Sequence, residues 1–167
     1  MHPAALPDEE LLKQCRIGKS RSSGPGGQHR NKVETQVTIT HLPTGLAARA
    51  GERRSAEENR RVAVRRLRLL LAVEVREPVP IGDVRSALWR SRCSPDGRVS
   101  CNPEHHDFPA LIAEALDVLD ACGLDPRKAA ARLCCSATQV VRLMKGYPPA
   151  LEHLNSARRE RKMHPLR

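Results

Sequence analysis

Residues 33–50 read VETQVTITHLPTGLAARA, and this stretch decides the fold. In its first half polar and apolar side chains alternate, a period of two that is typical of a half-buried strand. The side chains expected on one face are Val33, Thr35, Val37 and Ile39. Residues 42–45 have the Pro and Gly of a tight turn, and the alternation resumes at Leu46. We therefore predict a β-hairpin over residues 33–50.

The segments on either side of the hairpin complete a small α+β unit. An acidic helix start at residues 8–10 leads into a short strand at residues 15–19, and residues 22–28 form a loop that reads SSGPGGQ. After the hairpin, Ser55 with Glu58 three positions later predicts the start of a long helix. Its apolar face, expected to pack on the sheet, is Ala56, Ala63, Leu67 and Leu70.

The last third of the chain reads as helices. A helix is expected over residues 109–122, with Gly123 as its C-terminal cap. Asp125 followed by Pro126 predicts the next helix start, and a turn at residues 134–135 with a restart at Ser136 is typical of a helix-turn-helix. A last helix is expected over residues 149–162, ending in a basic run. The residues expected to be buried are Ile112, Ala115, Leu116, Leu119, Ala129, Ala130, Leu133, Val140, Val141 and Leu143.

These patterns predict an α+β chain with two domains. A domain with a small sheet packed by a long helix is expected over residues 1–76. A Pro-rich linker follows over residues 77–107, with Trp89 expected to dock it onto a domain. A small helical domain with a basic C-terminal tail is expected over residues 108–167.

The charge favours a polyanionic partner. The formal net charge is +10, and residues 13–32 hold six Lys or Arg and no acid. Nucleic acid is the first expectation and a membrane surface the second. No stretch approaches the ~18 consecutive apolar residues of a membrane span. The N-terminal residues have neither a signal-peptide nor a transit-peptide pattern, so we expect a cytoplasmic protein with no membrane partner.

Six cysteines raise the question of a metal site. Cys93 and Cys101, followed by His105 and His106, are the one candidate set. Their spacing fits no common zinc module, and the chain has no CxxC motif. We therefore expect free thiols, with no metal and no cofactor.

The loop at Gly26, Gly27 and Gln28 is the candidate catalytic site. Two glycines permit a ligand to lie against the main chain. Gln28 offers a backbone N–H and a neutral amide, and no nucleophile–base pair lies near it in the sequence. Such a site would position water and donate hydrogen bonds to developing charge, which suits hydrolysis of an ester.

The wider motif, SSGPGGQHRNKVE followed by THLPTG, resembles the catalytic domain of class I peptide chain release factors. Over residues 14–72 it is most similar to the codon-independent ribosome-rescue peptidyl-tRNA hydrolases of that family. The resemblance implies that the loop enters the peptidyl-transferase centre and that Gln28 promotes hydrolysis of P-site peptidyl-tRNA. It also implies that Gln28 is a site of N5-methylation by a partner methyltransferase. A monomer without cofactor is expected.

Contacts with large-subunit rRNA or the tRNA end are expected from residues around the loop and on the long helix. These residues are Arg21, Ser22, Ser23, His29, Arg30, Asn31, Lys32, Arg53, Arg54, Arg61 and Arg65. Arg30 stands where the family commonly has a small apolar residue. Arg61, Arg65 and Arg68 share a stripe that fits either an RNA-backbone contact or a solvated helix face.

Other interpretations stay open at this point. Release factors that read stop codons carry long extra domains, and the residues beyond the match are too few for them, so rescue of stalled ribosomes is favoured. Whether the basic tail, the helical unit or neither senses the stall is open, and we expect removal of residues 158–167 to weaken ribosome binding in a salt-dependent way. The alternatives are a DNA-binding regulator that uses the helix starting at Ser136, and a non-catalytic RNA-binding module.

Overall fold

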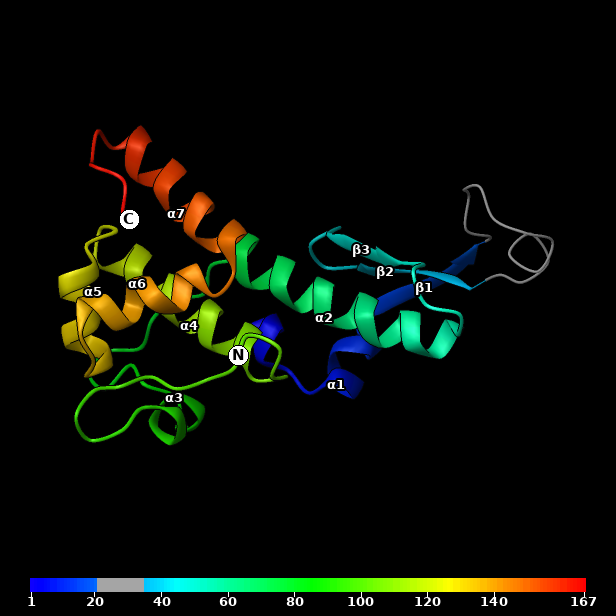
Figure 1. The fold of residues 1–167 in the computed structure, drawn as a ribbon, viewed down its shortest axis with the longest axis horizontal. Coiled ribbons are helices and arrows are strands. Elements are labelled where there is room, and N and C mark those ends of the chain that lie inside the picture. The colour runs from blue at the N-terminus through cyan, green and yellow to red at the C-terminus, as the bar shows by residue number, and fades with distance from the viewer. Residues whose placement is uncertain (21–34) are drawn as a thin grey trace. The chain divides into compact units, whose positions relative to one another are not determined.

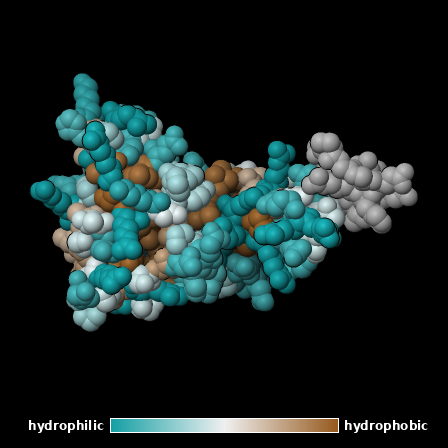
Figure 2. Space-filling model, in the orientation of Figure 1, coloured by the Kyte–Doolittle hydropathy of each residue, from teal (hydrophilic) through white to brown (hydrophobic). Residues whose placement is uncertain are grey.

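The computed structural model describes residues 1–20 and 35–167. The chain forms two compact units: Leu6–Leu71, and Met1–Ala5 together with Ala72–Arg167. The predicted boundaries at residues 76 and 107 stay predictions. In Figure 2, hydrophilic residues cover most of the visible surface, with smaller hydrophobic areas between them. No helix in the described ranges is long and apolar enough to cross a membrane.

The unit Leu6–Leu71 contains a three-stranded antiparallel sheet in the order β1 (Cys15–Ser20), β2 (Gln36–His41) and β3 (Ala47–Ala50) (Figure 1). The predicted hairpin is confirmed in its described part, with Val37 and Ile39 at most 1% exposed. At the turn, the Gly45 N–H donates to the His41 carbonyl at 2.8 Å. The period of two therefore places one face of β2 in the core.

Two helices belong to this sheet. Helix α1 (Asp8–Lys13) precedes β1, and helix α2 (Ala56–Glu74) follows β3 and runs beside the sheet (Figure 1). Ser55 Oγ accepts the Glu57 N–H at 3.2 Å, as its capping position predicts. Ala63 and Leu67 are fully buried, whereas Ala56 and Leu70 are half-exposed, so the predicted apolar face of α2 is confirmed only in part.

The second unit is helical. It contains a short 3-10 helix η1 (Pro3–Ala5), α3 (Ala87–Arg92), α4 (Phe108–Ala121), α5 (Pro126–Leu133), α6 (Ala137–Lys145) and α7 (Pro148–Glu160). Helix α4 packs against η1, α5 and α6, and α6 packs against α7. The predicted caps are confirmed: Asp125 Oδ1 accepts the Arg127 N–H at 2.8 Å, and Ser136 Oγ accepts the Gln139 N–H at 3.2 Å.

Two details of this unit differ from the prediction. Helix α3 was not expected, and Ser86 caps it by accepting the Trp89 N–H. Trp89 does dock this segment, because its fully buried indole N–H donates to the Leu133 carbonyl at 3.0 Å. In α6, Val141 is half-exposed and Met144 is buried instead. Residues 140, 143 and 144 share one helix face, and position 141 lies about 100° away from residue 140.

Candidate functional site

The strands β1 and β2 hold the two ends of the predicted catalytic loop. Ser20, the last residue of β1, pairs with Gln36, the first of β2, and Ser20 Oγ lies 3.4 Å from Gln36 Oε1. The chain therefore leaves and re-enters the sheet at adjacent positions. Gly26, Gly27 and Gln28 lie between them, outside the described residues, as do the predicted RNA contacts from Arg21 to Lys32.

A buried asparagine fixes the chain where it returns to the sheet. Asn59, on α2, is fully buried, and its Nδ2 donates to the Thr35 carbonyl at 2.7 Å and to the Arg53 carbonyl at 3.0 Å. Its Oδ1 accepts the Arg53 N–H at 2.9 Å. Asn59 was not among the residues predicted from the sequence. The available signal was an amide on the apolar side of a predicted helix, because a buried amide needs hydrogen-bond partners.

The opposite end of the sheet is held by His41. This residue is 2% exposed, with Nδ1 2.8 Å from Thr44 Oγ1 and Nε2 3.2 Å from Gln14 Oε1. Burial lowers its pKa from the usual histidine range. The turn after β2 and the residue after α1 are thus tied to the same ring, which makes the sheet a stable base for the loop.

The predicted RNA-binding arginines within the described residues differ in exposure. Arg53, Arg54 and Arg61 are exposed, and Arg65 is half-buried. Arg61 Nε lies 3.6 Å from Glu57 Oε1, a pair exposed enough to be worth little. The predicted stripe does not extend to Arg68, whose side chain is 8% exposed and lies 3.4 Å from Asp8. One turn further along α2 the helix face turns toward α1, so Arg68 has a structural role.

The helix-turn-helix-like part, α5 and α6, is partly covered by the segment before α4. Gln139 Oε1, on α6, accepts the Val99 N–H at 3.2 Å. A Cβ on Gly97 would lie 3.2 Å from Cys135 Cα, so this segment packs closely on the turn between the two helices. Gln139 is therefore engaged within the unit, whereas Thr138, Arg142 and Lys145 remain exposed.

The C-terminal basic run is not a uniform tail. Arg158 is 8% exposed, its Nε donates to the His164 carbonyl at 2.9 Å, and its Nη1 donates to the Leu124 carbonyl. Asn155 and Leu166 exchange two hydrogen bonds, of 2.7 and 3.0 Å. The last residues thus fold back along α7. Arg159, Arg161 and Lys162 are exposed and are the residues of the run that could contact RNA.

The predicted metal candidates do not come together as a set. Cys93 Sγ lies 3.7 Å from the Cys134 carbonyl oxygen. Among the described residues, the group with ligand atoms within 4.8 Å of one another is His105, His106 and Asp107. The Arg92 guanidinium already lies 2.5 Å from Asp107 Oδ2, so a cation would have to displace a positive charge.

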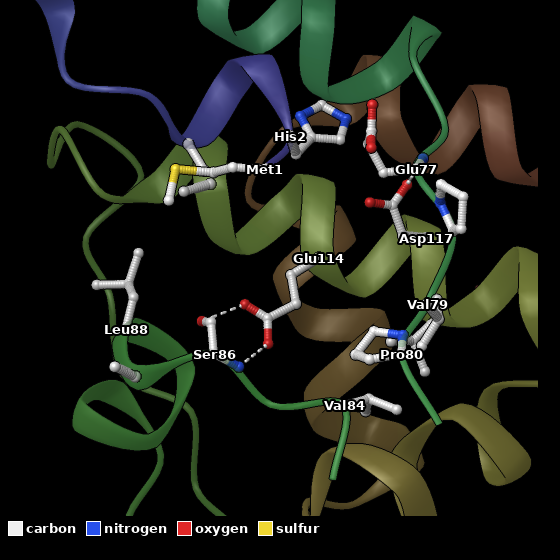
Figure 3. A pocket seen from close by; sticks show the side chains of 15 residues that line it. Met1, His2, Glu77, Val79, Pro80, Val84, Ser86, Leu88, Glu114 and Asp117 are labelled. Atoms are coloured by element: carbon white, nitrogen blue, oxygen red, sulfur yellow. Dashed lines mark hydrogen bonds between the residues drawn. The ribbon is translucent and has the colours of Figure 1, made fainter. Parts of the chain in front are cut away.

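A cavity of about 510 Å³ lies in the helical unit, bordered by η1, α4 and the segment that leads to α3 (Figure 3). Glu114 in its wall accepts the Ser86 N–H and hydroxyl, at 2.7 and 2.5 Å. Asp117 accepts hydrogen bonds from Arg76 and the Glu77 N–H, and burial raises its pKa to about 6. None of the predicted site residues borders this cavity.

The part of the chain that contains the loop, the sheet and α2 matches a known domain family. Residues 9–80 match the RF-1 domain, the catalytic domain of class I peptide chain release factors. The resemblance drawn from the motif is therefore confirmed. Its narrower form, a codon-independent rescue factor, stays a proposal.

The similar proteins are peptide chain release factors. The chain is 36% identical over 155 residues to peptide chain release factor 1 of Acidiphilium cryptum, covering 80% of this chain and 43% of that protein. It is 36% identical over 134 residues to the protein of the same name from Leptospira biflexa, covering 70% of this chain and 38% of that protein. The chloroplastic peptide chain release factor PrfB1 of Arabidopsis thaliana is 42% identical over 82 residues, which is 48% of this chain and 17% of that protein. The chain thus spans less than half the length of these relatives.

Proposed function

We propose that this chain hydrolyses the ester bond of peptidyl-tRNA on the ribosome and releases the nascent peptide without reading a stop codon. The observation that carries the proposal is the placement of the loop. A GGQ sequence lies between two paired strand ends, Ser20 and Gln36, within a segment that matches the RF-1 domain. Both ends of the loop are thus fixed by the sheet, and Asn59 holds the returning end.

In this proposal, the loop acts by positioning and hydrogen bonding. A water oxygen attacks the ester carbonyl carbon, the bond to the tRNA 3′-oxygen breaks, and that oxygen takes a proton. The products are a peptide carboxylic acid and the free tRNA 3′-hydroxyl. The Gln28 backbone N–H donates to the charge that develops on oxygen, and its side chain places the water. Gly26 and Gly27 permit the approach of the tRNA end to the main chain.

The partners in this proposal are large-subunit rRNA at the peptidyl-transferase centre and P-site peptidyl-tRNA. The exposed Arg53, Arg54 and Arg61 contact RNA phosphates, as do the basic residues of the loop. Gln28 is N5-methylated by a partner methyltransferase, and the protein acts as a monomer.

The codon-independent part of the proposal is supported by what accompanies the RF-1 domain. The residues after the match, 81–167, contain helices α3 to α7 and lie within the helical unit. The exposed Arg159, Arg161 and Lys162 of this unit suit contacts with RNA phosphates, which carry no sequence information, rather than contacts with the bases of a codon.

The test compares two ribosome complexes that carry the same labelled peptide. One complex is stalled on an mRNA truncated after the P-site codon, and the other has a stop codon in the A site. The proposal predicts release from the truncated complex, with Gly27→Ala as a variant that binds but releases little. Release only from the stop-codon complex would show codon dependence, and release from neither would remove the hydrolase assignment.

The contact between Gln139 and Val99 weighs against the DNA-binding alternative, because one of the polar side chains of α6 that could read bases is engaged within the unit. We expect the protein to bind ribosomes, and we expect duplex DNA not to compete with that binding.

A further inference from the structure

The sheet has a second face that α2 does not cover. The strand register places alternate residues of β1, β2 and β3 on this face, opposite to the buried Val37 and Ile39. We define the open face by these residues: Arg16, Gly18, Ser20, Gln36, Thr38, Thr40, Ala47 and Arg49. The residues of β1 and β3 among them are exposed, and those of β2 are half-exposed.

The side chains of the open face are of the kinds that bind phosphate groups. It has two arginines, two threonines, a serine and a glutamine, and no acid. Within the described residues, no hydrogen bond or ion pair engages the guanidinium of Arg16 or Arg49. Arginine, hydroxyl and amide groups are the donors that proteins use to contact nucleic-acid phosphates. The unit Leu6–Leu71 also carries the excess charge, with 14 Lys or Arg against 7 Asp or Glu.

Gly18 adds an independent observation. It lies in the interior of β1, where glycine weakens a strand, and its φ is not positive. A Cβ at this position would meet only the Thr38 carbonyl oxygen, 4.0 Å away, so neither backbone conformation nor packing requires glycine. A glycine within a strand often marks a place where a ligand comes close to the main chain. Because Gly18 has no side chain, the main chain is accessible at this point of the open face.

The two arginines border Gly18 in two directions: Arg16 lies two residues away along β1, and Arg49 lies on β3 in the same cross-strand row as Gly18. Arg16 is opposite Thr40, and Arg49 is opposite Thr38, which itself pairs with Gly18. With strands ~4.8 Å apart and ~3.4 Å per residue, the two Cα atoms are about 12 Å apart across the sheet. We infer that the open face is a docking surface for an RNA backbone, with phosphodiester groups lying over Gly18 and held by Arg16 and Arg49. This inference rests on the proposed ribosome-bound function and adds a contact surface separate from the loop.

Binding to isolated large ribosomal subunits, measured by pelleting over a range of salt concentrations, tests the inference. Arg16→Ala with Arg49→Ala is expected to weaken binding about tenfold near 100 mM salt and to reduce the slope of log affinity against log salt by about 2. The Lys substitutions at both positions keep the charge and are expected to restore most of the affinity. The control is Arg127→Ala, which removes an exposed arginine from α5 in the helical unit.

Gly18→Glu and Gly18→Gln form a second, matched pair. The side chains have the same size, and the open position accommodates either one, so folding is expected to be retained in both. Only Glu adds a negative charge under the phosphates, so Gly18→Glu is expected to bind at least fivefold more weakly than Gly18→Gln.

The inference is overturned if the double alanine variant binds as Arg127→Ala does, if Gly18→Glu binds as Gly18→Gln does, or if the unmodified protein does not bind large subunits. Because the readout is binding alone, it is separate from peptide release. A protein that binds through this face without releasing peptide would contradict the proposed hydrolase and leave the RNA surface intact.

Discussion

Asn59 Nδ2 lies 2.7 Å from the carbonyl oxygen of Thr35, and this contact joins α2 to the residue that directly precedes β2, where the chain returns from the GGQ loop. The same amide group bonds both the N–H and the carbonyl of Arg53. One fully buried side chain therefore fixes the residue that follows the loop and the turn that begins α2. The sheet is a base for the loop only as long as this amide is satisfied.

Asn59→Ala is expected to lower the free energy of unfolding by about 2–4 kcal/mol, because it leaves three part-buried backbone groups, the Thr35 carbonyl and the N–H and carbonyl of Arg53, without their partner. Urea denaturation followed by circular dichroism measures the change. The neighbouring Arg60→Ala removes a half-exposed side chain and is expected to stay within about 0.5 kcal/mol of the unmodified protein. Equal losses for the two variants would contradict the role given to Asn59.

Arg158 and Arg159 are adjacent in the sequence but differ in what they do. Arg158→Ala removes donors from the Leu124 and His164 carbonyls and is expected to cost about 2–4 kcal/mol of stability. Arg159→Ala, at an exposed position, is expected to change stability by less than about 0.5 kcal/mol. Thermal unfolding of both variants separates the two, and a stable Arg158→Ala protein would show that the C-terminal fold-back is not needed.

Removal of residues 158–167 is therefore a poor test of the basic tail, because it also removes Arg158 and the contacts of Leu166. Substitution of Arg159, Arg161 and Lys162 by Ala keeps those contacts. We expect this triple variant to bind ribosomes more weakly, with a salt slope smaller by about 2–3. Unchanged binding at both low and high salt would exclude the tail from the ribosome contact.

Asp117 makes stability depend on pH. Burial raises its pKa to about 6, above the ordinary aspartate value of 3.8, so the folded protein holds this proton at pH values where the unfolded chain has lost it. The stabilisation of the folded state by the protonated Asp117 is fully present below about pH 4 and is lost as pH rises through about 6. From pH 4 to 7, the stability of the unmodified protein relative to Asp117→Asn should fall, by at most about 3 kcal/mol. A difference independent of pH would falsify the raised pKa.

Much of the fold follows from local patterns. The alternation over residues 35–41 predicts β2, and Asp125, Ser136 and Ser55 predict helix starts that the structure confirms. These signals succeed because the groups that satisfy each other lie within a few residues. The short motif around Gln28 also indicated the resemblance to release factor catalytic domains, and the match over residues 9–80 confirms it.

What the sequence could not supply depends on contacts between distant residues. The roles of Arg68 and Arg158 require knowledge of what each side chain faces, and a charged residue on a predicted helix gives no such indication. The position of Asn59 on the apolar side of its helix indicated burial but not its partners, Thr35 and Arg53. Helix α3 is only six residues long, too short for a clear period, and is stabilised by its Ser86 cap and the buried Trp89. The catalytic and RNA-binding roles of residues 21–32 remain predictions, because those residues lie outside the described ranges.

The most direct test is the rate of peptide release at saturating protein from ribosomes stalled on truncated mRNA, for the unmodified protein, Gln28→Ala and Gln28→Pro. Gln28→Pro removes the backbone N–H proposed to stabilise developing charge, and Gln28→Ala retains it. We expect Gln28→Pro still to pellet with ribosomes and to release peptide about 10²–10³ times more slowly, with a smaller loss for Gln28→Ala. Release by Gln28→Pro at the unmodified rate would contradict the claim that this loop performs the hydrolysis.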